Sequence, residues 1–227
     1  MIKWSKTILY IMGSAILANF LPFSSFFKNV DTLIHEFGHA AVTLALSGRV
    51  MDIALYSDQS GITRSVVANG WSMLPIGLAG YMTASLFTWY LFASYAKGRQ
   101  RSGLIAITIL AAVALALFVR NGYGFTWLIG FIGINIVVLM FAGKGISRFY
   151  YLLIAFLSLE ESVFGPIWLN FAAVMSPGRA GDASSLSHTT SVPAIVWSFW
   201  FTLFAVWCAK QAITAFVGRD ELQKAAK

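Results

Sequence analysis

The chain alternates long apolar runs with short polar or basic links. The apolar runs cover residues 7–23, 71–96, 103–119, 125–142, 149–174 and 192–217. A helix needs about 17 residues or more to cross the hydrocarbon core of a bilayer, and each run is long enough. The pattern therefore predicts a membrane helix in each of the six runs.

A seventh helix is predicted at residues 29–46, where apolar residues are interrupted by a few polar ones. It should end at Ser47-Gly48, because glycine commonly terminates helices. Residues 49–69 then read as strand, turn and strand, with the turn at residues 57–61, which predicts a β-hairpin. An open strand edge is tolerated at membrane depth only when protein or water covers it, so the hairpin lies either at the surface or beside an internal site.

The composition places the chain among membrane proteins. It is 58% hydrophobic and 11% charged, and its mean hydropathy is +0.74, which excludes an ordinary soluble protein. We predict an all-α polytopic membrane protein with about six or seven transmembrane helices and one small β-hairpin, forming a single domain over residues 1–227. The net charge of +7 is scattered over the links, and no basic-aromatic patch indicates a nucleic-acid partner.

The basic residues also bear on orientation. The basic link at residues 97–101 and the basic tail at 219–227 fall on one side of the membrane if four helices lie between them. Positive charge near helix ends favours the cytoplasm, so we expect both to be cytoplasmic. Seven full spans would then place Lys3 and Lys6 outside, against the same rule. Either the N-terminus is an exception, or one apolar run does not cross.

The predicted helix at 29–46 contains the motif His35-Glu36-x-x-His39. On a helix this spacing places both imidazoles on one face, where they can bind one metal ion, with Glu36 within reach of a water on that metal. The single cysteine, Cys208, excludes a cysteine-based zinc site. Ionisable groups are costly in a membrane and persist where they pair, bind an ion or face a wet cavity, so this set indicates a functional site.

A site with two histidines needs a further ligand, because a catalytic zinc takes three protein ligands and leaves one position open. Residues 176–191, which read as a loop before the last apolar run, offer Asp182 and His188. Gly181 lets the backbone approach other helices closely beside Asp182, whereas His188 lies in a polar stretch suited to solvent. Weaker candidates are the pair Glu160 and Glu161, for which we favour a structural role, and the hairpin residues Asp52 and Asp58.

Taken together, these residues resemble the site-2 protease class of intramembrane zinc metalloproteases, in particular a compact bacterial branch without appended domains. The resemblance rests on residues 35–40 early in the chain, on Gly48-Arg49-Val50, on Ser60-Gly61 in the hairpin and on a late aspartate. The third metal ligand of the class maps onto Asp182. The usual Asp-Gly pattern is changed here, because Ala183 follows Asp182.

The resemblance implies a zinc metalloendopeptidase in a bacterial cytoplasmic membrane, with Zn2+ held by His35, His39 and Asp182. Glu36 would act as general base toward water and then pass the proton to the leaving amine. The expected partners are a membrane-protein substrate and the bilayer, and the hairpin edge would hold an unwound substrate segment extended. A metal-binding transporter and a catalytically inactive scaffold are the alternatives, and Glu36 is the residue that a mere binding site does not need.

Overall fold

The computed structural model describes residues 4–20 and 23–225. Lys3 and Lys227 lie outside this part of the chain, as do the side chains of Lys6 and Lys224. The described elements are α1 (Trp4–Phe20), α2 (Ser24–Ala45), β1 (Arg49–Leu55), β2 (Gly61–Val66), η1 (Gly70–Ser72), α3 (Met73–Ala96), α4 (Gln100–Leu117), α5 (Gly122–Phe141), α6 (Lys144–Met175), η2 (Pro177–Arg179), α7 (Gly181–Thr190) and α8 (Ala194–Ala225). The predicted helical membrane fold with one hairpin is confirmed.

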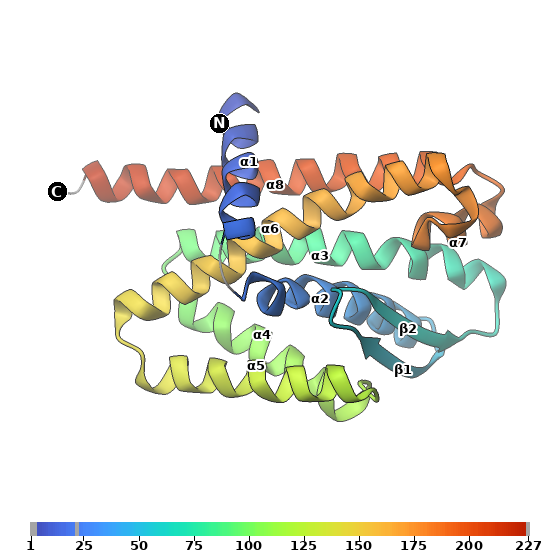
Figure 1. Cartoon of the computed structure of the whole chain (residues 1–227), viewed down its shortest axis with the longest axis horizontal. Helices are drawn as coiled ribbons and strands as arrows, with labels where there is room; N and C mark the ends of the chain where they lie inside the picture. Colours follow the sequence, from blue (N-terminus) through green and yellow to red (C-terminus); the bar gives the residue numbers. More distant parts are fainter. Residues whose placement is uncertain (1–3, 21–22, 226–227) are drawn as a thin grey trace.

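Five of the described helices, namely α3 to α6 and α8, are long and apolar enough to cross a membrane. The apolar part of α1, Thr7–Ile16, is shorter. Figure 1 shows α1 inclined steeply to the other long helices, which lie roughly along one direction.

Helix α2 lies inside the bundle and packs against α3, α6 and both strands (Figure 1). Its apolar face, which includes Val30 and Leu33, is fully buried. On another face, the ammonium group of Lys28 lies 2.7 Å from a carboxylate oxygen of Glu160 and 2.7 Å from one of Glu161. These ion pairs compensate charges inside the protein, which agrees with a structural role for the two glutamates.

The hairpin packs against α2 as an antiparallel pair in which Ile53 lies opposite Thr63 and Leu55 lies opposite Gly61. The far edge of β1 is bonded to the α4–α5 link, because Ile53 N–H donates to the Phe118 carbonyl at 2.9 Å. The sheet has the order β1-β2, so within the described part of the chain no strand pairs with the outer edge of β2. One edge of the hairpin is thereby anchored, and the other is not paired with a strand of the described chain.

The segment expected as a loop at residues 176–191 differs from the prediction, because most of it forms α7. Gly181 begins this helix at a φ of +45°, a conformation that favours glycine. Leu186 of α7 is fully buried against α3, where a Cβ at Gly77 would lie 2.8 Å from its side chain. A short polar segment forms a helix here because tertiary packing of Ala183 and Leu186 supports it.

Candidate metal centre

His35 and His39 lie one turn apart on α2 with their Nε2 atoms 3.0 Å from each other. The Nδ1 atom of His39 lies 2.7 Å from the backbone oxygen of Ile76 in α3. A carbonyl can only accept, so this contact assigns the proton to Nδ1 and leaves Nε2 with its lone pair. The helical spacing therefore brings the two imidazoles together as the motif predicts, and α3 fixes the tautomer of one of them.

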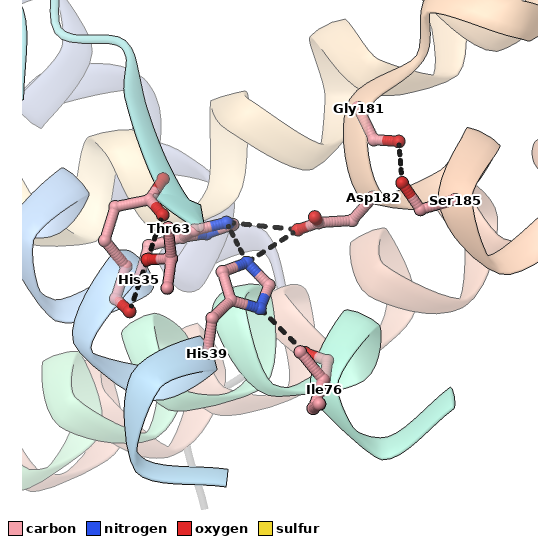
Figure 2. A network of polar contacts seen from close by, with 8 residues as sticks. His35, His39, Thr63, Ile76, Gly181, Asp182 and Ser185 are labelled. Atoms are coloured by element: carbon pink, nitrogen blue, oxygen red, sulfur yellow. Dashed lines mark hydrogen bonds and ion pairs between the residues drawn. The ribbon is translucent and has the colours of Figure 1, made fainter. Parts of the chain in front are cut away.

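Asp182, at the start of α7, points toward both histidines (Figure 2). Its Oδ2 atom lies 3.1 Å from Nε2 of His35 and 3.2 Å from Nε2 of His39. This oxygen is buried and accepts no hydrogen bond from the residues that the structure describes. Docking of α7 against α3 thus places Asp182, which is distant in sequence, beside the α2 motif.

The electrostatics of this cluster favour a cation. Burial raises the pKa of the Asp182 carboxyl, but the neighbouring imidazoles of His39 and His35 outweigh burial and hold this pKa well below its usual range. The His39 Nε2 and Asp182 Oδ2 atoms both present lone pairs, which repel each other unless a proton or a metal ion lies between them.

The three donor atoms also fit zinc. Ligand atoms around a tetrahedral zinc lie about 3.3 Å apart, close to the separations found here. Gly80 of α3 leaves the space open, since a Cβ there would lie 2.4 Å from Nε2 of His35 and 2.5 Å from Nε2 of His39. The residues present can therefore hold a metal ion, and a larger side chain at position 80 would obstruct it.

Glu36 lies on α2 between the two histidines in sequence and is 6% exposed. The Thr63 hydroxyl of β2 donates to its Oε2 atom at 2.7 Å and lies 2.9 Å from its backbone oxygen. Gly61 packs against the same side chain, because a Cβ at that position would lie 2.7 Å from Glu36 Cγ. The hairpin therefore orients the carboxylate beside the histidines.

A cavity of about 570 Å³ opens at this cluster. Its lining includes Glu36, His39 and Asp182, together with residues 61–65 of β2 and residues from the N-terminal part of α3. Residues of β2 and the carboxylates of Glu36 and Asp182 therefore line the same cavity.

The other acidic and histidine candidates lie elsewhere. Within the described chain, the group with metal-ligand geometry contains His35, His39 and Asp182, and His188 is not part of it. Asp52 pairs with Arg64 at 3.4 Å, and Asp58 accepts hydrogen bonds from Ser60 in the hairpin turn.

Sequence reasoning did not identify Thr63, the Ile76 carbonyl or Gly80 as parts of the site. No motif signals a threonine that meets Glu36 across 27 positions. The close pair Gly77 and Gly80 was the available signal, since both admit side chains from other helices.

Comparison with known proteins agrees with this geometry. The profile of the Peptidase M50B-like family matches residues 7–212 of the 227-residue chain, a range that includes α2, the hairpin and α7. No curated protein and no solved structure gives a significant match. The family match covers most of the chain and confirms the resemblance that the motif indicated. The chain therefore belongs to the Peptidase M50B-like family, a family of site-2 proteases.

Proposed function

We propose that this protein is a zinc metalloendopeptidase that hydrolyses a peptide bond in or near a transmembrane segment of another membrane protein. The observation that carries the proposal is the convergence of His35, His39 and Asp182, whose donor atoms lie within 4.8 Å of one another beside the buried Glu36. Two histidines and one carboxylate are a known donor set for catalytic zinc and leave one coordination position open.

In this proposal His35, His39 and Asp182 would hold the zinc, which would supply a Lewis acid and lower the pKa of water toward neutrality. Glu36 accepts a proton from the attacking water and gives it to the leaving amine. The Thr63 hydroxyl bonds to one carboxylate oxygen of Glu36, so that the other oxygen remains available for this proton.

The outer edge of β2 is the proposed docking strand for the substrate. A membrane-spanning substrate hides its carbonyl groups in helical hydrogen bonds, so the segment to be cut must first unwind. An extended segment can then pair with β2 through main-chain hydrogen bonds. Because β2 residues 61–65 line the same cavity as Glu36 and Asp182, this pairing would bring a substrate peptide bond to the proposed zinc.

A metal transporter and an inactive scaffold are the competing functions. Both are disfavoured by Glu36, because a transit or scaffold site needs no carboxylate held by a hydroxyl beside the ligands. A transporter would also have to release the ion through the bundle, whereas Glu36 has a defined task in hydrolysis.

The test is zinc analysis of the purified chain together with a cleavage assay on model membrane helices. Glu36→Gln should keep stoichiometric zinc and lower cleavage by about 100-fold or more, because the amide cannot accept the proton. His188→Ala is the control and should retain both properties. Full cleavage by Glu36→Gln would refute the mechanism. If the unmodified chain bound zinc but cleaved no substrate, a transporter or an inactive scaffold would be favoured.

A further inference from the structure

A tight turn precedes Asp182 in the chain. Helix α6 ends at Met175, the short helix η2 (Pro177–Arg179) follows, and α7 begins at Gly181, whose φ is +45°. Asp182 is the second residue of α7 and points from there toward the two imidazoles (Figure 2). The position of its carboxylate therefore depends on how firmly the turn is held.

The hydroxyl group of Ser184 holds this turn closed. It donates to the backbone oxygen of Pro177 at 2.5 Å and accepts from the backbone N–H of Ala180 at 2.7 Å. One oxygen atom thus joins the start of η2, the residue before α7 and the first turn of α7. Ser184 is 6% exposed, so both hydrogen bonds lie away from bulk water, where the loss of a partner is costly.

The backbone to which Ser184 is bonded is fixed in the core. Ala180 and Ala183 are fully buried in an apolar cluster that also contains Leu169 of α6 and Phe201 of α8. A shift of this part of the turn would disturb close packing between three helices. Ser184 therefore bonds the first turn of α7 to a part of the chain that the core holds in place.

We infer that Ser184 is the positioning residue of Asp182 and thereby sets the affinity of the proposed zinc site. The inference rests on that site, in which Oδ2 of Asp182 lies 3.1 and 3.2 Å from the two imidazole nitrogens. Ser184 does not line the cavity at the metal centre, so it acts through Asp182 and not on the substrate. Asp182 lies within the segment 177–184 that the hydroxyl closes, and loss of the hydroxyl frees the carboxylate to move away from the imidazoles.

The experiment measures the zinc affinity of the purified full chain at buffered free zinc concentrations. Ser184→Ala should weaken zinc binding roughly 10- to 100-fold, which is the usual effect of removing a group that orients a metal ligand. Alanine has a higher helix propensity than serine, so α7 should remain helical. Thr189→Ala is the matched control, because it removes a hydroxyl of the same helix whose hydrogen bond, 3.0 Å to the Ser185 backbone oxygen, stays within α7.

A double-mutant cycle separates positioning of Asp182 from a general loosening of the fold. Two changes that act on one interaction are not additive. Ser184→Ala should therefore weaken zinc binding when Asp182 is present and cause no further loss in the Asp182→Ala chain, where the two histidines remain as ligands. A loosened bundle would instead weaken zinc binding by the same factor in both chains.

The inference would be overturned if Ser184→Ala bound zinc as tightly as the unmodified chain, or if it caused the same loss with and without Asp182. A loss that requires Asp182, with the Thr189→Ala control unaffected, would support it. Zinc binding is measured separately from cleavage, so the two proposals can fail independently. A chain that showed this pattern of zinc binding but cut no substrate would refute the protease function and still support the role of Ser184.

Discussion

Replacing Gly80 by alanine is the sharpest test of the metal centre, because the added methyl group would occupy the space between the ligands. Ordinary van der Waals contact begins at 3.4 Å, and the new Cβ would lie 2.4 and 2.5 Å from the Nε2 atoms of His35 and His39. The methyl is therefore about 1 Å too close to each nitrogen. Both atoms belong to imidazoles held in the bundle, so either the rings or α3 must move.

The expected magnitude follows from that displacement. Misplacing a group by about 1 Å in a preorganised site costs about 100-fold, so zinc affinity should fall by at least this factor. Overpacking costs the fold about 1–3 kcal/mol, and the helix propensity of alanine, about 1 kcal/mol better than that of glycine, offsets part of this cost. Gly80→Ala should thus lose zinc and cleavage while the helical bundle remains folded.

The assay measures zinc per chain by mass spectrometry at several buffered free zinc concentrations, together with the melting temperature from circular dichroism. Gly133→Ala provides the control, because this glycine also lies in a helix and its Cβ would meet no atom within 4 Å. If Gly80→Ala bound zinc as tightly as the unmodified chain, the reasoning would be refuted. The metal would then not be bound by these two nitrogens.

Three further predictions follow from the same geometry. Asp182→Ala should lower zinc affinity and cleavage together while His188→Ala changes neither, as zinc content and product formation would show; the reverse pattern would transfer the ligand role to His188. Thr63→Val should lower kcat about five- to ten-fold with zinc retained, because it removes a hydrogen bond worth about 1 kcal/mol from Glu36, and Thr63→Ser should restore the rate. A cysteine at Lys97 should resist impermeant labelling of intact cells and one at Asp58 should react, because the basic end is expected to be cytoplasmic and the hairpin lies at the other end (Figure 1).

The sequence by itself determined the helices and the hairpin, because each of these features depends on residues that lie close together in the chain. Apolar runs longer than the hydrocarbon core require helices, since each backbone group must be satisfied within its own segment. The pairing of His35 with His39 is equally local, because four residues make about one helical turn. The turn around Ser60-Gly61 likewise follows from residues that are adjacent in the chain.

Only the tertiary structure decided which distant groups complete the site. Asp182 and His188 lie in the same polar segment, and helix packing brings the first to the imidazoles through Leu186 and Gly77. Packing also turned that expected loop into α7, because a ten-residue helix with few apolar residues depends on its neighbours. Contacts between segments far apart in the chain leave no periodic signal in the sequence, so the partnership of Thr63 with Glu36 and the space beside Gly80 emerge only when α2, α3 and the hairpin are packed together.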